Sequence, residues 1–214
     1  MKFKALFLLL LMLTGCGVAE KTQNADNSKG NELYVAGKYT EAVEWYRKAA
    51  EQGHIKAQRN MGKCYNYGHG VSQDFAEAAK WYSKAAEQGD AMSQYLLAGL
   101  YFSGQGVAQD FSKSIDLYHK AAEQGYVEAQ YQLAWCYAEG KMVPQNKAKA
   151  VELYRKAADQ EYPSAQIALG FCYGKGEGVT KDTAEAKKWF RKAIGNGYRV
   201  AEMYIEQIDN NTLK

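Results

Sequence analysis

Three of the four cysteines are the side chains best suited to chemistry, and they recur at a fixed spacing. Cys64, Cys136 and Cys172 lie 36 or 72 residues apart. A thiolate can act as a nucleophile or as a metal ligand, and two cysteines form a disulfide only when their Cα atoms lie within about 7 Å. Equivalent helices of a stacked array lie about 8–10 Å apart. We therefore predict three free thiols that pack as small buried apolar side chains.

No other motif predicts catalysis or metal binding. His54, His69 and His119 lack the spacing of metal ligands, and the sequence contains neither CxxC nor HExxH. The Ser-x-x-Lys, Ser-Asp-Asn and Lys-Thr-Gly motifs of penicillin-binding proteins are absent. Paired glycines such as Gly68 and Gly70 recur without a preceding strand, which indicates turns and not phosphate-binding loops. We predict no catalytic residue, no metal site and no cofactor.

The N-terminus has the pattern of a secretory signal peptide. Lys2 and Lys4 precede an apolar run at residues 5–13, which is shorter than the roughly twenty residues that a membrane-spanning helix needs. The sequence Leu13-Thr14-Gly15-Cys16 then resembles a bacterial lipobox. This resemblance implies that a signal peptide, residues 1–15, is cleaved and that Cys16 carries lipid.

The predicted anchor sets the expected location of the mature protein. Gly17 follows the cysteine, as in lipoproteins of the outer membrane, so we expect a protein of the bacterial envelope that faces the periplasm. Membrane contact is expected through Cys16 alone, since several acyl chains on one cysteine hold a protein stably. Residues 16–28 are polar and aperiodic, and we expect a flexible tether there.

The charge balance argues against a nucleic-acid partner. The chain has 27 basic and 24 acidic residues, and removal of Lys2 and Lys4 with the signal peptide leaves 25 basic residues. A net charge near +1 provides no basic patch for a phosphate backbone.

Most of the chain follows a repeat of 36 residues. One column of the repeat contains Tyr46, Tyr82, Tyr118, Tyr154 and Phe190, and a second contains Ala49, Ala85, Ala121, Ala157 and Ala193. Within one unit, Ala78, Tyr82 and Ala85 form one stripe of an α-helix. Each unit therefore predicts two helices, at about residues 57–67 and 74–88 in the second unit, with Asp74 as an N-cap.

These residues carry a family resemblance. The segment from Trp81 to Gly89 and the Gly-x-Gly-Val segment from Gly68 to Val71 resemble Sel-one-like repeats (SLR), which are relatives of the tetratricopeptide repeat. The resemblance implies an all-α fold: a right-handed αα-superhelix, or solenoid, of 36-residue helical hairpins over residues 29–208, followed by a polar tail at residues 209–214. It also implies an adaptor that binds other proteins.

Two positions depart from the repeat pattern. Glu161 occupies the place of a glycine that ends the second helix of other units, and Met142 replaces the second glycine of a linker. If Glu161 takes a positive φ, the expected cost is roughly 1 kcal/mol. We expect local distortion there and the same fold.

The repeats also predict a binding surface. In the first helix of each unit, the positions that stay constant between units lie on one face, and the positions that change lie on the opposite face. In the resembling family the first helices line the concave side, so the changing face is expected to bind a protein or peptide. Its residues are Arg59, Lys63, Tyr95, Phe102, Tyr131, Trp135, Ile167 and Phe171. Aromatic side chains with nearby cations are typical of interaction hot spots, and lateral packing between helices is the alternative; Trp135 is the first candidate.

Three functions remain open from the sequence. The leading one is a scaffold or adaptor lipoprotein that binds a protein or peptide in its groove. A narrower version is a periplasmic immunity protein that neutralises a secreted antibacterial effector. The third is a protein that binds the cell wall or β-lactams, with or without catalysis, and it would need a polar constellation that the predicted groove lacks.

Overall fold

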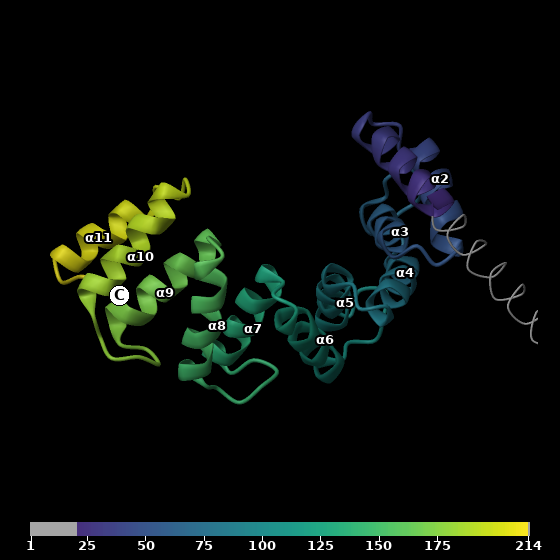
Figure 1. Ribbon diagram of the computed structural model, residues 1–214. Helices are drawn as coiled ribbons and strands as arrows, with labels where there is room; N and C mark the ends of the chain where they lie inside the picture. The colour runs from purple at the N-terminus through teal and green to yellow at the C-terminus, as the bar shows by residue number, and fades with distance from the viewer. Residues whose placement is uncertain (1–20, 214) are drawn as a thin grey trace, which may run out of the picture. The chain divides into compact units, whose positions relative to one another are not determined.

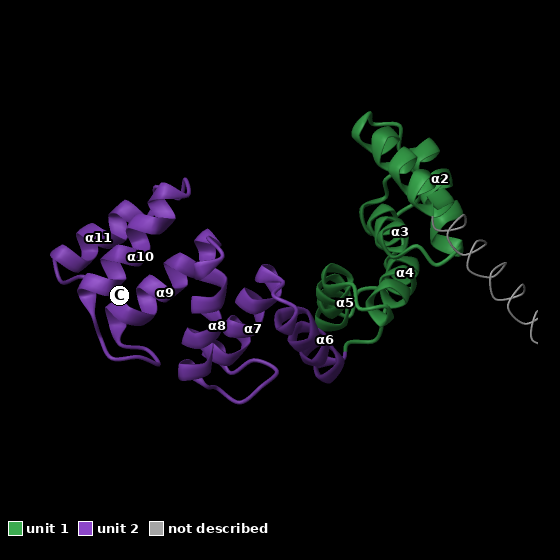
Figure 2. Cartoon of the chain, viewed as in Figure 1, with its two compact units in different colours: residues 1–109 green, residues 110–214 purple. Residues whose placement is uncertain are grey.

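The computed structural model describes residues 21–213, and every regular element within this range is helical. The chain forms two compact units, of which the first ends at Gln109 and the second begins at Asp110 (Figure 2). Unit 1 contains a helix at residues 21–35, followed by α2 (Tyr39–Glu51), α3 (Ile55–Tyr67), α4 (Phe75–Glu87) and α5 (Ala91–Ser103). Unit 2 contains α6 (Phe111–Glu123), α7 (Val127–Glu139), α8 (Lys147–Asp159), α9 (Pro163–Lys175), α10 (Thr183–Gly195) and α11 (Ala201–Asp209).

Consecutive helices pack against each other as hairpins. The pair α3 and α4 in unit 1 and the pair α9 and α10 in unit 2 lie side by side (Figure 1). The helix bounds agree with the predicted pair of helices to within two residues at either end. The predicted all-α fold of repeated helical hairpins is therefore confirmed.

The predicted signals at the ends of the helices form as expected. The Asp74 carboxylate accepts hydrogen bonds from the backbone N–H groups of Ala76 and Glu77 at 2.9 and 3.0 Å, which satisfies donors that the first helical turn leaves free. Asp110 accepts the N–H of Lys113 in the same way. After α4, Gly89 takes a φ of +91°, the left-handed conformation that ends a helix.

Glycine is required where one linker touches an earlier helix. The linker before α6 brings Gly106 so close to the start of α4 that an added Cβ would lie 2.2–2.4 Å from the backbone of Phe75 and Ala76. Gly178 approaches Lys147 of α8 in the same way. Each of these two linkers therefore packs against the N-terminus of the second helix of the preceding repeat.

The core of each hairpin is built from alanines and one large ring. The Tyr82 ring, 1% exposed, lies over Gly62, where an added Cβ would be 2.5 Å from the ring. Phe190 lies over Gly170 in the same way in the last units. The repeated column of aromatic residues is thus the interior of the array, and small residues on the first helix make room for it.

A buried glutamine connects three helices in each repeat. Gln58, at the start of α3, donates to the backbone carbonyl of Ala50 in α2 at 3.1 Å and accepts from the Gln88 side chain after α4 at 2.7 Å. The pattern recurs in unit 2, where Gln166 donates to Ala158 and accepts from Asn196. These bonds give the carbonyls of Ala50 and Ala158 a second, buried donor beside the backbone N–H groups of Gly53 and Glu161.

The first helix differs from the expected flexible tether. Residues 21–35 are helical, so the part of the predicted tether at residues 21–28 belongs to the fold. Asp26 and Asn27 are 4% and 5% exposed, and Asp26 pairs with Lys48 of α2 at 3.1 Å. A polar composition concealed the start of this helix, because Asp26 and Asn27 are its buried side chains there, whereas Leu33 packs against the apolar core near its other end. The predicted signal peptide and Cys16 lie outside the described residues.

The end of the chain also packs more closely than its polar composition predicts. α11 ends at Asp209, and an added Cβ at Gly174 would lie 2.5 Å from the Leu213 side chain. The predicted polar tail therefore contacts α9 through at least one apolar residue. None of the described helices is long and apolar enough to cross a membrane.

The two departures from the repeat keep the backbone of the other units. Glu161 has a φ of +62° and Met142 a φ of +65°, where the equivalent positions of other units are glycines with positive φ. The helices on either side begin and end at the expected places. The distortion expected at Glu161 is thus limited to a strained backbone conformation.

Candidate functional site

The predicted binding face lies on α3, α5, α7 and α9, the first helices of the repeats. All eight of its side chains are half-buried, so none is sealed inside the protein and none stands fully in solvent. Half-burial is compatible with both interpretations of the face, as a binding surface and as packing between helices. The contacts of the individual residues separate the two.

In unit 2, two aromatic residues of this face pack against neighbouring helices. The Tyr131 ring lies 5.6 Å from the Tyr154 ring and 5.4 Å from the Tyr162 ring. The Phe171 ring lies 4.6 Å from the Tyr204 ring, and Ile167 contacts the same core cluster at the end of the chain. These residues contribute to the stability of the array as well as to its surface.

Trp135 has a different environment. The Lys141 ammonium, from the linker after α7, lies 4.7 Å from the centre of the Trp135 ring. This cation–π contact holds one face of the indole without covering the whole side chain, which is half-buried. A large aromatic ring that remains partly open is the residue type that most often anchors a protein partner.

In unit 1, the two predicted cations have different roles. Arg59 donates to the Asp90 carboxylate at 2.7 Å, and both side chains are mostly buried. Asp90 also caps α5 by accepting the backbone N–H of Ser93, so the Arg59–Asp90 ion pair joins α3 to the start of α5. Lys63, one turn further along α3, forms no ion pair with any described residue.

A cavity of about 350 Å³ surrounds Lys63 at the N-terminal end of unit 1. Its lining comes from the helix at residues 21–35, from α2 and from α3, and it consists of Asn31, Tyr34, Val35, Tyr46, Asn60, Lys63 and Tyr67. The sequence predicted Lys63 as a site residue but missed the residues of the first helix. The signal that could have found them is Tyr34, an aromatic residue outside the repeat columns beside the exposed Val35.

An aromatic cluster borders this cavity. Tyr34 donates or accepts a hydrogen bond with Nδ1 of His69 at 2.6 Å. The His69 ring stacks on Tyr39 at 4.7 Å and lies 5.7 Å from Tyr67. His69 lies in a glycine-rich linker, is half-buried, and holds this linker against the first hairpin through Tyr34 and Tyr39.

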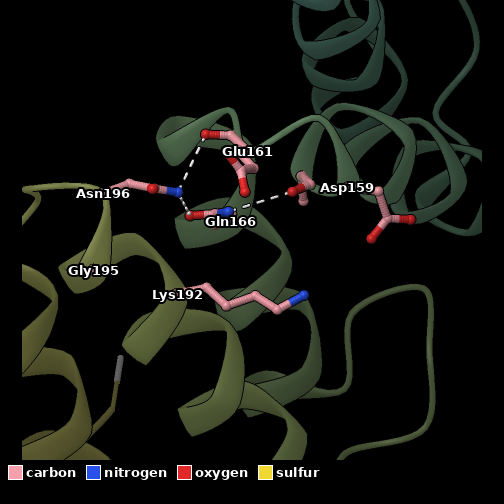
Figure 3. A pocket seen from close by; sticks show the side chains of 7 residues that line it. Asp159, Glu161, Gln166, Lys192, Gly195 and Asn196 are labelled. Atoms are coloured by element: carbon pink, nitrogen blue, oxygen red, sulfur yellow. Dashed lines mark hydrogen bonds between the residues drawn. The ribbon is translucent and has the colours of Figure 1, made fainter.

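A second cavity of about 350 Å³ lies in unit 2, where α8 and α10 end (Figure 3). The Asn196 side chain donates to the backbone carbonyl of Glu161 at 3.4 Å and to Oε1 of Gln166 at 3.1 Å. Lys192 and Asp159 also line this cavity. Two of its polar side chains, Gln166 and Asn196, form the hydrogen bonds that connect neighbouring repeats, which indicates a structural role for this part of the cavity.

The three recurring cysteines are free thiols. Cys64 and Cys136 are fully buried and Cys172 is half-buried. Burial raises the pKa of each thiol to about 11, which disfavours the reactive thiolate. Within residues 21–213, no three His, Cys, Asp or Glu side chains are grouped as metal ligands.

The repeat family follows from comparison with known proteins. The Sel1 repeat matches residues 28–54, 55–90, 91–126, 127–162 and 163–204. The chain is a Sel1 repeat protein. Helical repeats of this kind are scaffolds for protein–protein interaction, and the resemblance that the sequence motifs indicated is confirmed.

Solved structures support the same assignment. This Sel1 repeat protein is similar to a protective antigen of uropathogenic Escherichia coli with an SLR fold, at 36% identity and a TM-score of 0.82, over 88% of this chain and 41% of that chain. It is also similar to a Sel1 repeat protein from Oxalobacter formigenes, at 35% identity and a TM-score of 0.79, over 88% of this chain and 76% of that chain.

One curated relative matches over a short stretch. The DAP3-binding cell death enhancer 1 of Rattus norvegicus is 42% identical over 50 residues, which is 23% of this chain and 10% of that protein. The chain thus spans well under half of the E. coli antigen and a tenth of the rat protein. These similarities establish the repeat family of the chain. The partners that this chain binds are the subject of the proposal below.

Proposed function

We propose that this protein is a non-enzymatic interaction protein of the bacterial envelope, anchored by lipid on Cys16, that binds a partner protein through side chains of its first helices. The observation that carries the proposal is Trp135 of α7, a large ring that contacts the Lys141 ammonium and remains partly open to solvent. Partly open aromatic and aliphatic groups bind by losing apolar surface to a partner.

The constant positions of the same helices support the proposal that one face of each helix packs and the opposite face binds. Ala57 and Met61 of α3 are fully buried, and Gln58 is 5% exposed. The equivalent positions of later repeats, such as Ser93 and Leu97, are buried as well, because they pack between helices. The eight residues of the changing face retain some contact with solvent, as expected if a partner protein shapes them.

Photo-crosslinking in cells tests the proposal. A photoreactive phenylalanine analogue at position 135 replaces one large ring by another on α7. The same analogue at position 152, an exposed residue on α8, is the control. We expect one predominant crosslinked protein from position 135 and none of that species from position 152. Equal capture of the same species from the two positions, or no capture from position 135, contradicts the proposal.

The identity of the captured protein then distinguishes the versions of the function. Capture of a secreted antibacterial effector supports the immunity role, in which case deletion of the gene lowers survival against a strain that delivers this effector. Capture of a resident envelope protein supports the scaffold role. Retention of the purified protein by peptidoglycan or by labelled penicillin, with no captured protein, favours the third function.

The anchor is tested separately. We expect cells to incorporate labelled palmitate into the wild-type protein and not into a Cys16→Ser variant. The variant is expected to leave the membrane fraction, because contact with the membrane is proposed to depend on this one residue. A variant that stays in the membrane fraction contradicts the anchor and leaves the interaction surface unaffected.

A further inference from the structure

Lys63 is a half-buried cation that forms no ion pair with any residue between positions 21 and 213. The nearest acidic group that influences it is Asp90, whose carboxylate already binds Arg59 at 2.7 Å. Burial, followed by repulsion from Arg59, lowers the pKa of Lys63. Removing a cation from water without a partner costs stability, so the position is unfavourable for the isolated protein.

The cavity around Lys63 offers hydrogen-bond donors and no acid. Oδ1 of Asn31 accepts from the Tyr46 hydroxyl at 2.9 Å and from Asn60 at 3.1 Å. These two bonds fix the orientation of the Asn31 amide and leave its NH₂ group without a partner among the described residues. The lining contains one ammonium group and several phenol and amide groups, and no carboxylate.

The rim of the cavity is apolar. Val35 is 88% exposed and Tyr67 is 56% exposed, which are high values for large apolar side chains in this protein. A ligand that fits the whole feature therefore has a negative group for the interior and apolar groups for the rim.

We propose that this cavity binds an acidic side chain, Asp or Glu, within an otherwise apolar segment of the partner protein, with the carboxylate on the Lys63 ammonium and the Asn31 amide. The inference rests on the proposed function and names the chemistry of the partner at one place on the surface. A segment that continues past its acidic residue covers Val35 and Tyr67 together, whereas the end of a chain covers less of the rim. A carboxylate is the group that matches an ammonium and an amide donor at once.

Short peptides of defined chemistry provide the test. The probes are pools of pentapeptides, acetylated and amidated at their ends, with Glu, Gln or Lys at the centre and apolar residues around it. A fourth pool has Gln at the centre and a free C-terminal carboxylate. Each pool is titrated into the ¹⁵N-labelled protein, and the backbone amide signals of Asn31, Asn60, Lys63 and Tyr67 are followed.

We expect the Glu pool to shift these four signals and to bind at least tenfold more tightly than the Gln and Lys pools. A Lys63→Met variant should lose this preference, while Lys56→Met, which removes an exposed lysine from the same helix, should keep it. Lys63→Met should also unfold at the same temperature as the wild type or higher, since it removes an unpaired cation. This last readout separates loss of binding from loss of folding.

Three results overturn the inference. They are equal binding of the Glu and Gln pools, preference for the free C-terminal carboxylate, and the absence of shifts near Lys63 with every pool. Crosslinking from position 135 distinguishes its failure from failure of the proposed function. If Lys63→Met still captures the partner at the wild-type level, the proposed function stands and the acidic recognition is wrong.

Discussion

Glu161 shows how a single residue can depart from the repeat without changing the fold. Its φ of +62° lies in the left-handed region, its side chain is exposed, and the hydrogen bond that it accepts from Asn196 goes to its backbone carbonyl, which a glycine would keep. Replacement by glycine should therefore stabilise the protein by about 1 kcal/mol. The reciprocal change, Gly125→Ala, should destabilise by a similar amount, because that glycine has a φ of +83° and no atom within 4 Å of an added Cβ.

Denaturant unfolding of the two variants measures both effects. Gly125 and Glu161 occupy equivalent places in successive repeats, 36 residues apart, so the pair forms a matched comparison. If Glu161→Gly is less stable than the wild type, the glutamate side chain makes a favourable contact whose free energy exceeds that of the backbone strain.

The buried thiols predict a specific dependence of stability on pH. Burial raises the pKa of Cys64 from an ordinary value of 9.0 to about 11, so the unfolded chain loses this proton at a lower pH than the folded chain. The stability associated with the neutral thiol is complete below pH 9 and is lost as the pH rises toward 11. This difference between the two pKa values corresponds to about 2–3 kcal/mol of unfolding free energy.

Comparison with Cys64→Ala isolates this contribution. The variant should lose less stability than the wild type between pH 9 and pH 11, whatever its stability at neutral pH. Thiol titration at pH 8 should be slow in the native protein and should give three thiols in the denatured, unreduced mature chain. A count of one would mean that two of the cysteines form a disulfide.

At the scale of helices, the buried glutamines connect neighbouring repeats. Gln130 of α7 donates to the Ala122 carbonyl at 3.2 Å inside the protein, whereas Gln145 donates to the Ala138 carbonyl at 2.8 Å on the surface. Gln130→Leu removes a buried hydrogen bond to the Ala122 carbonyl, which keeps the backbone N–H of Gly125 as its other donor, and should cost about 1 kcal/mol. In Gln145→Leu, water replaces the lost donor, so the cost should be well below 1 kcal/mol.

This pair of variants tests whether burial, and not the bond itself, gives the glutamine its importance. Thermal or denaturant unfolding provides the measurement. Equal losses of stability in the two variants would contradict the assignment of Gln130 as a connector between α6, α7 and α8.

The hairpins were predictable from the sequence because their signals are local and repeated. The N-cap position of Asp74 and the aromatic position of Tyr82 recur every 36 residues. Several repeats therefore support the same prediction of two helices. The helix at residues 21–35 occurs once, and its first half packs through the polar residues Asp26 and Asn27, which have no periodic apolar signature. The cavity around Lys63 depends on that helix, and its residues were therefore missed.

At the scale of the whole chain, stability should be distributed unevenly along the repeats. In α11 the one buried residue is Ala201, and Val200 and Met203 nearby are 51% and 45% exposed. Internal helices such as α8 bury residues against a neighbour before and after them. We expect amide hydrogen exchange to be fastest in α11 and slowest in α8 and α9 of unit 2, because an end unit has one neighbour. Uniform protection across unit 2 would contradict this gradient.

The hydrogen bonds of the buried glutamines have a consequence for how the number of repeats can change in the gene. Gln130 binds the carbonyl of Ala122, and Gln166 binds the carbonyl of Ala158, with the same partners and the same spacing. If residues 127–162 were excised, Gln166 would bind the Ala122 carbonyl as Gln130 does now. The repeats on either side of the deletion would then pack as neighbours. A gene for such a protein can therefore gain or lose whole units by recombination between its own copies, so that natural selection can adjust the length of the protein while its fold persists.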